Sequence, residues 1–254
     1  MLIKAGEIIF KSIELYKKNW QLFFRYAGLY LISTMLIITA QLIFKPIEII
    51  GDSARITRGF YPFVPVAIVA SIASIWFSIA FLRAISARYQ GSAPGAIMDE
   101  LKKATKLIIP SVLALLLVMA IVFGGLLLLI IPGIIFSLWF AFSFYAIALD
   151  EHKVMASLKE SRKLVKNRWF AVFWRLFAPG FVFGATASIA QWIVALIFGF
   201  LGNSAIALLF AGLFTTIANL FFVPLTTAAT TILYLELKKT PNKIVAPKKL
   251  PPAK

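Results

Sequence analysis

Four long intervals of the sequence contain no charged residue, and they restrict the fold more than any other feature. They cover residues 26–44, 59–82, 107–149 and 176–235. A helix rises about 1.5 Å per residue and a hydrocarbon core is about 30 Å thick, so one crossing takes about 20 apolar residues. The two longer intervals would measure about 64 Å and 90 Å as single helices, so each crosses twice. The sequence therefore predicts an all-α integral membrane bundle of six transmembrane helices.

The two longer intervals each need an internal turn. Pro132 and Gly133 lie near the middle of the first, and this pair is typical of a hairpin turn. In the second, Gly202 lies in a stretch of small and polar residues that predicts the other turn. Pro179 and Pro224 are expected to kink the fifth and sixth spans. The predicted spans are residues 22–44, 61–82, 107–131, 133–149, 170–199 and 205–235.

Composition and charge support this membrane assignment. The chain is 61% hydrophobic and only 14% charged, and it has no cysteine, which excludes disulfides and thiolate chemistry. Although the net charge is +16, the basic residues gather in short segments between the apolar intervals. Four of these segments hold 21 Lys and Arg residues, while the opposite side has only Lys45, Arg55 and Arg58. This unequal distribution of basic residues between the two sides predicts how the protein is oriented in the membrane, rather than nucleic-acid binding.

This orientation defines the predicted domains and location. Residues 1–235 form one membrane domain, and residues 236–254 form a basic, disordered cytoplasmic tail. Short basic segments stay in the cytoplasm, so both termini are expected there, in a multi-pass protein of the cell membrane.

Each predicted hairpin follows a basic segment that is expected to form an amphipathic interfacial helix. In the first, an apolar stripe of Ile9, Ile13, Tyr16 and Trp20 would face the membrane. The third segment repeats the first at a constant offset, which indicates parallel internal repeats. Ser12, Leu15, Lys17, Trp20 and Phe24 correspond to Ser161, Leu164, Lys166, Trp169 and Phe173. The basic and aromatic residues expected at the interface are Lys17, Lys18, Trp20, Lys166, Arg168 and Trp169.

Several short motifs resemble one membrane family. They are Ile131–Ile135, Ala148–Glu151, Ala156–Ser161, Asn167–Trp169, and the segment Arg88–Leu107 with Gly91 and Pro94. They are similar to the membrane domain found fused to some glycerophosphodiester phosphodiesterases, and to related stand-alone six-helix proteins. In the fused proteins a separate soluble barrel carries the phosphodiesterase chemistry, so the resemblance implies a membrane part without a catalytic set.

Four polar residues in or near the spans are candidate contacts for a lipid or a substrate. Arg25 and Arg175 lie near the starts of the first and fifth spans, where they either bind a phosphate or extend to nearby headgroups. Gln191 and Asn219 lie deep in the fifth and sixth spans. They either pair between helices or line a polar path.

Asp150, Glu151 and His152 form the one acidic cluster beside an apolar interval. The cluster lacks the spacing of a helical metal site, and we interpret the two acids as favourable charges at the start of a basic helix. We expect no metal, no cofactor and no catalytic residue.

The residues described above leave two functions open. The first is a non-catalytic, lipid-contacting scaffold or accessory subunit, whose partners would be the bilayer, anionic phospholipid headgroups and a membrane protein. The second is a transporter or flippase-like permease for a lipid or small amphiphile, suggested by Arg175, Gln191, Asn219 and the two prolines. No carboxylate lies within the predicted spans, which disfavours proton coupling.

Overall fold

The computed structural model describes residues 2–50, 53–199 and 205–240, and this part of the chain is almost entirely helical. Six helical segments within it are long and apolar enough to cross a membrane, which confirms the predicted fold class. The helices are α1 (Ala5–Lys18), α2 (Trp20–Phe44), α3 (Phe60–Tyr89), α4 (Ile97–Thr105), α5 (Ile108–Leu128), α6 (Ile130–Phe140), α7 (Ser143–Asp150), α8 (Val154–Val165), α9 (Trp169–Gly199) and α10 (Ala205–Lys239). The strands are β1 (Ile47–Ile50) and β2 (Ser53–Ile56).

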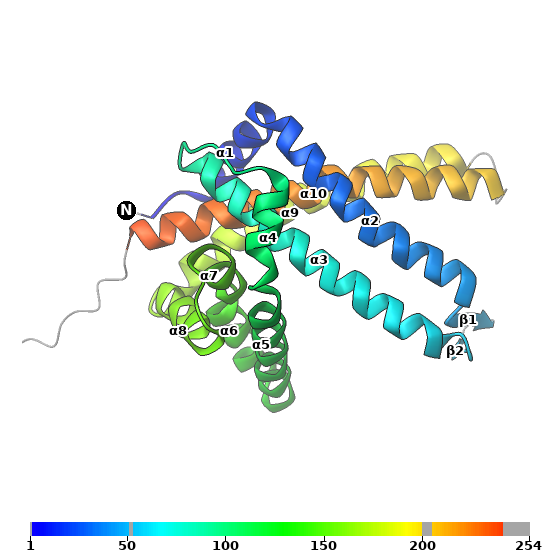
Figure 1. Cartoon of the computed structure of the whole chain (residues 1–254), viewed down its shortest axis with the longest axis horizontal. Coiled ribbons are helices and arrows are strands. Elements are labelled where there is room, and N and C mark those ends of the chain that lie inside the picture. The colour runs from blue at the N-terminus through cyan, green and yellow to red at the C-terminus, as the bar shows by residue number, and fades with distance from the viewer. Residues whose placement is uncertain (1, 51–52, 200–204, 241–254) are drawn as a thin grey trace, which may run out of the picture.

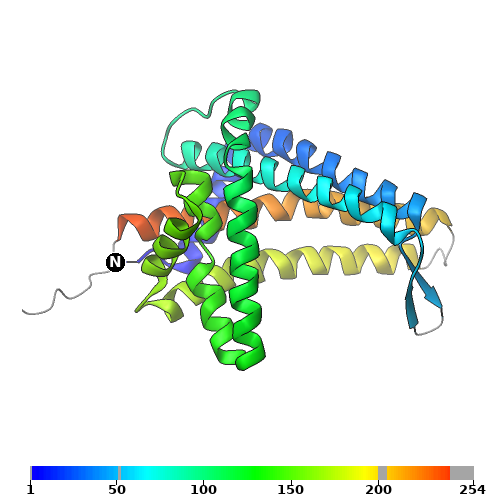
Figure 2. The same ribbon diagram turned by 60° about the horizontal axis from the view of Figure 1, so that its bottom comes forward.

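The long helices form three hairpins that extend in different directions from a common cluster (Figure 1). They are α2 with α3, α5 with α6 and α7, and α9 with α10. The short helix α4 packs against α3, and α8 packs against α5, α6 and α7. Each thus contacts the hairpin that precedes it in the chain, while α1 packs against α9 and α10, the last hairpin. We call the end of the molecule where the short helices gather the basic end (Figure 2).

The helix starts reproduce the predicted repeat. An offset of 149 residues separates Ala5 from Val154, where α1 and α8 begin, and also Trp20 from Trp169, where α2 and α9 begin. The matched residues Ser12 and Ser161 are both fully buried, and Leu15 and Leu164 are only 9% and 4% exposed. The buried face of α1 differs from the predicted stripe, because Ile8, Ser12 and Leu15 are buried while Ile9, Ile13 and Tyr16 are only partly so. The reason is that α1 packs on α9 and α10 as well as lying beside the membrane helices.

The hydrophobic core lies at the basic end. Most of its fully buried residues come from the C-terminal half of α3, from α7 and from the last turns of α10. Among them, the Phe81 ring contacts Phe23 and Tyr26 of α2, with ring centroids 5.4 and 5.2 Å apart. On α10, Tyr234 contacts Phe142 and Tyr145. The first contacts close the α2–α3 hairpin, and the second join α10 to the α5–α7 hairpin.

Polar bonds reinforce the same end. Arg83 of α3 donates to Glu100 of α4 at 3.0 Å and to Glu151 at 3.1 Å. Asp150 accepts hydrogen bonds from Tyr234 and, at 2.7 Å, from Lys238, both on α10. These pairs link the three hairpins. They also correct our interpretation of Asp150 and Glu151, which end α7 rather than begin α8 and neutralise cations of other helices instead of a helix dipole.

The predicted turn at Pro132 and Gly133 is wrong by three residues. The chain reverses at Leu129, the one extended residue between α5 and α6. Pro132 instead lies in the first turn of α6. Backbone N–H groups there have no acceptor within the helix, so the missing N–H of proline costs no hydrogen bond. Gly133 packs against α5, since a Cβ there would come within 2.5 Å of the Leu126 side chain. The glycine therefore allows close helix contact rather than a turn.

Other boundaries also differ from the predictions. A two-stranded antiparallel ribbon, β1 with β2, joins α2 to α3, and the sequence analysis missed it. The last helix continues to Lys239, so residues 236–239 belong to the bundle, and Leu237 is fully buried. Pro179 and Pro224 lie inside α9 and α10, which continue through both positions. Gly202 and residues 241–254 of the predicted tail lie outside the described residues.

Candidate functional site

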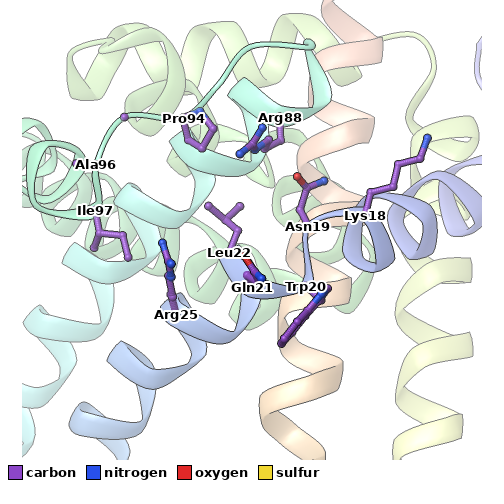
Figure 3. A pocket seen from close by; sticks show the side chains of 11 residues that line it. Lys18, Asn19, Trp20, Gln21, Leu22, Arg25, Arg88, Pro94, Ala96 and Ile97 are labelled. Carbon is purple, nitrogen blue, oxygen red and sulfur yellow. The ribbon is translucent and has the colours of Figure 1, made fainter.

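A cavity of about 500 Å³ opens at the basic end, between the start of α2 and the connection from α3 to α4 (Figure 3). We call it the basic pocket. Its lining residues are Lys18, Asn19, Trp20, Gln21, Leu22, Arg25, Arg88, Pro94, Gly95, Ala96 and Ile97. The volume lies within the range usual for small-ligand sites.

One wall of the basic pocket is the junction between α1 and α2. Asn19 is the single residue between the two helices, and its side chain donates to the Leu15 carbonyl at 3.0 Å. The same carbonyl also accepts the Asn19 backbone N–H at 3.1 Å, so both groups of Asn19 close the end of α1. The tight junction places Lys18 and Trp20 on either side of Asn19, and Arg25 follows in the second turn of α2.

The other wall is the chain between α3 and α4. Gly91 follows the end of α3 with a φ of +81°, and Ser92 N–H bonds back to the Ala87 carbonyl at 2.9 Å. This is a helix-ending turn that favours glycine, because a side chain is disfavoured at positive φ. The turn sends the chain through Pro94 to Ala96, the N-cap residue of α4.

Two bonds fix α4 in this position. Trp76 of α3 donates its indole N–H to the Leu101 carbonyl at 2.7 Å. Arg83 and Glu100 form the ion pair described above, and the Glu100 side chain is only 9% exposed. The start of α4 is thus held over the start of α2, with Arg88 beside both.

The basic pocket carries an excess of positive charge. Lys18, Arg25 and Arg88 line it, and none of its described lining residues is acidic. Lys18 pairs with Glu14 at 2.7 Å, but both side chains are well exposed, so this pair is weak. Arg25 and Arg88 are exposed and form no ion pair with any residue in the described part of the chain. Figure 3 shows both guanidinium groups extending into the space between α2 and the α3–α4 connection.

The start of α4 adds to this charge. Ala96 has no side chain that could cap the helix, so the first N–H groups of α4 lack a side-chain acceptor. These N–H groups carry the positive end of the helix dipole, which Asp99 and Glu100 in the first turn of α4 partly offset. Glu100 lies near Gly95 in the wall, but Arg83 and Lys103 already pair with it. The site as a whole suits a negatively charged group.

The lining also has apolar parts. Trp20 is 54% exposed, and Leu22 and Ile97 lie on the two walls. An exposed tryptophan beside arginines at the start of an apolar helix is typical of a membrane interface. The basic pocket therefore combines a polar and an apolar surface, as a glycerophospholipid headgroup region does.

A second cavity of about 580 Å³ adjoins the first and shares Lys18, Asn19 and Arg88 with it. Its charges are mixed, since Glu236 lies there and accepts from Tyr89 at 3.0 Å and from Lys239 at 2.7 Å. A hydrogen bond from Lys11 to Glu7 raises the pKa of Lys11 above its usual value. Acidic residues thus partly compensate the positive charge of the second cavity, whereas no described acid lines the basic pocket.

The structure brings together only part of the predicted contact set. Arg25 lies in the basic pocket with Lys18 and Trp20, whereas Arg175 does not. Arg175 donates to the carbonyl of Ile3 and, at 2.8 Å, to that of Ala171. It thus fastens the N-terminal segment to α9.

The remaining candidates do not form a polar path in the described part of the chain. Gln191 is half-buried on α9 and has no hydrogen-bond partner among the described residues, and the side chain of Asn219 lies outside them. Lys17, Lys166 and Trp169 are exposed at the basic end, as expected for residues at an interface.

Arg168 has a structural role. Its guanidinium donates to the carbonyls of Leu164 and Thr240, both at 2.6 Å, and of Leu237 at 3.2 Å. These groups include free carbonyls at the end of α10. Burial lowers the pKa of Arg168 below its usual value, although it stays protonated. We predicted Arg168 as an interfacial cation, and the structure shows a helix cap.

The sequence analysis missed Arg88 and the segment Pro94–Ile97 as parts of the site. Arg88 entered the sequence analysis as a basic loop residue and as the start of the motif Arg88–Leu107, not as a site residue. The signal that could have found the site is the combination of Gly91 and Pro94, because a glycine turn followed by proline sends the chain back across the end of α3.

The fold and the six apolar helices define a multi-pass helical membrane protein. Comparisons with protein-family models, with curated proteins and with solved structures found no match. The similarity to the phosphodiesterase-fused membrane domain therefore stays a prediction.

Proposed function

We propose that this protein is a non-catalytic membrane protein that contacts lipids, as a scaffold or an accessory subunit to a membrane protein partner. The basic end lies in the cytoplasm, with both termini. The basic pocket holds the phosphate of an anionic phospholipid from the cytoplasmic leaflet of the cell membrane.

One observation carries this proposal: Lys18, Arg25 and Arg88 converge on one cavity whose described lining has no acid, at the end of a membrane helix. Arginine binds phosphate oxygens through two parallel N–H groups, which makes Arg25 and Arg88 suitable partners. The depth fits as well, because Trp20 opens α2 where headgroups meet hydrocarbon. The excess of basic residues on this side supports the cytoplasmic orientation.

The flippase-like alternative has less support. It requires a polar path through the bundle, and Arg175, its main cation, already bonds to two carbonyls of the protein. In liposomes with a fluorescent phospholipid, we expect scrambling at the rate of protein-free vesicles. Fast scrambling that the substitution Arg175→Ala abolishes would favour the permease.

A binding measurement tests the headgroup site. The purified protein in detergent is titrated with dioleoyl phosphatidylglycerol or dioleoyl phosphatidylcholine, and native mass spectrometry counts the bound lipids. We expect the protein to prefer phosphatidylglycerol, and the double variant Arg25→Gln, Arg88→Gln to lose about 1 kcal/mol of binding per arginine. Free glycerol phosphate in a parallel titration distinguishes a lipid site from a site for a soluble anion.

The matched control is Arg58→Gln. Arg58 is also exposed, but it lies at the opposite end of the molecule, after β2. This variant removes a positive charge without touching the basic pocket. If it weakens phosphatidylglycerol binding as much as Arg25→Gln does, the preference reflects total charge and the proposal is wrong.

A further inference from the structure

Two cavities of about 220 and 320 Å³ lie between α2 and α10, on membrane helices. They share Ala27 and Leu31 in their linings, so they form one continuous depression, which we call the α2–α10 groove. The smaller cavity begins at Tyr16 of α1, and the larger one reaches Thr34 of α2 and Thr216 of α10. The groove is separate from the basic pocket, and no residue lines both.

The length of the groove matches one leaflet of a membrane. Along α2 it extends from Phe23 at the basic end to Thr34, which corresponds to a rise of about 16 Å. Half of a hydrocarbon core measures about 15 Å. The groove therefore covers the depth that an acyl chain of one leaflet occupies.

The lining excludes water as the occupant. A water molecule in such a site needs two to four polar partners. The Tyr30 hydroxyl already donates to Ser78 at 2.7 Å, and the Thr34 hydroxyl donates to the Tyr30 carbonyl at 2.9 Å. The other described lining residues are mostly apolar, so hydrocarbon is the occupant that fits this depth.

The groove is open because its lining includes small residues. Gly28 lies on the smaller cavity, and a Cβ placed there would meet no atom within 4 Å. At the same level Phe24 and Phe221 meet edge to face, with centroids 5.4 Å apart, and connect α2 to α10. Pro224 lines the deeper cavity on the α10 side.

We propose that the α2–α10 groove binds one acyl chain of a phospholipid from the leaflet at the basic end. The chain gains no hydrophobic transfer energy, because the surrounding lipid is equally apolar. It gains the close contacts of a shaped cavity, which an unfilled groove would lose. The headgroup above it is not selected by charge, so the site accepts a zwitterionic lipid.

A photocrosslinking experiment tests this proposal independently of the basic pocket. The probe is a phosphatidylcholine with a diazirine at the middle of one acyl chain, added at about one molecule per protein in excess detergent. Because this lipid has no net charge, failure of the headgroup proposal does not affect the result. We expect crosslinks on Leu31, Phe221 and Val223, at least fivefold above those on Leu116 and Leu127, which are exposed on α5.

Substitutions at Gly28 are expected to obstruct the groove to different degrees. Gly28→Leu fills the open space without displacing the fold, and we expect it to remove most of the groove crosslinks, while Gly28→Ala removes fewer. The control is Gly184→Leu on α9, where a Cβ also meets nothing within 4 Å and which does not line the groove. Equal labelling of α5 and the groove would overturn the proposal. So would unchanged groove labelling in Gly28→Leu with an unaltered melting temperature.

Discussion

Arg168 lies just before α9 and Arg25 lies in the second turn of α2, two membrane helices whose starts are related by the offset of 149 residues, although this offset aligns Arg168 with Asn19 rather than with Arg25. Arg168 is half-buried, and its described hydrogen bonds all go to backbone carbonyls. Arg25 is exposed, forms no hydrogen bond or ion pair with any described residue, and shares a cavity with Arg88. An arginine near the start of one of these helices thus caps a helix end, whereas an arginine near the start of the other has no partner among the described residues.

The reason for this difference is the polarity of the neighbouring helix. Arg168 faces the C-terminus of α10, where free carbonyls accept hydrogen bonds and the dipole is negative. Arg25 shares its pocket with the N-terminus of α4, where free N–H groups are donors and the dipole is positive. Arg25 has no partner among the described residues there, although the first turn of α4 also carries Asp99 and Glu100. The direction of the adjacent helix thus separates the arginine that caps a helix end from the arginine without a described partner.

The largest effect is expected from Arg168→Ala. The variant leaves the buried carbonyls at the end of α10 without donors, and each such group costs about 1–3 kcal/mol. We expect the free energy of unfolding to fall by about 2–4 kcal/mol, seen as a lower melting temperature in detergent. Phosphatidylglycerol binding at temperatures where the variant is folded should be unchanged.

Arg25→Ala is the matched variant and should reverse this pattern. It removes an exposed side chain without a described partner, so the melting temperature should shift little. If both variants lowered stability equally, the contrast between the two arginines would disappear.

A smaller loss of stability is expected from Gly91→Val. A β-branched residue at a φ of +81° is strained, and left-handed backbone costs about 1–2 kcal/mol in residues with a side chain. Because this turn positions Pro94 and Ile97, lipid binding in the basic pocket should weaken as well. Gly124→Val, at a helical glycine with open space around it, is the comparison. Equal binding in both variants would show that the α3–α4 connection does not form the pocket.

Raising the salt concentration tests the difference between Arg168 and the exposed Arg25 and Arg88. The Debye length falls from about 10 Å at 0.1 M salt to about 3 Å at 1 M, so attraction by the exposed Arg25 and Arg88 is screened. We expect phosphatidylglycerol binding to weaken several-fold over this range. The bonds of Arg168 are short, half-buried and made to neutral carbonyls, so the melting temperature should change less. A melting temperature that falls together with binding would contradict this assignment.

The sequence predicted the six spans and the paired starts of α1 with α8 and α2 with α9, because hydropathy and charge spacing are properties of the local chain. It could not predict the basic pocket, since Arg25 and Arg88 meet only through the packing of α2, α3 and α4. It also could not separate Arg168 from Arg25, because the carbonyl acceptors of Arg168 include two about 70 residues away in the chain. The turn at Leu129 was misplaced because proline is compatible with both a turn and the first turn of a helix.

The smallest effect should come from Glu14→Gln. Glu14 accepts a hydrogen bond from Lys18 at 2.7 Å, and this bond lowers the pKa of Glu14 below 4.5. The pair is therefore present at neutral pH and is lost as the pH falls through the lowered pKa. Removing the carboxylate releases Lys18 toward the basic pocket, so phosphatidylglycerol affinity should rise by about twofold, in line with the weakness of exposed pairs.

The control is Glu7→Gln on the same helix. Glu7 pairs with Lys11, which lines the neighbouring mixed-charge cavity but not the basic pocket. Both variants add the same net charge to α1, and only Glu14→Gln releases a cation that lines the site. A rise in affinity for Glu14→Gln alone would place the bound phosphate beside Lys18, whereas an equal rise in both would mean that the lipid senses the whole surface of α1.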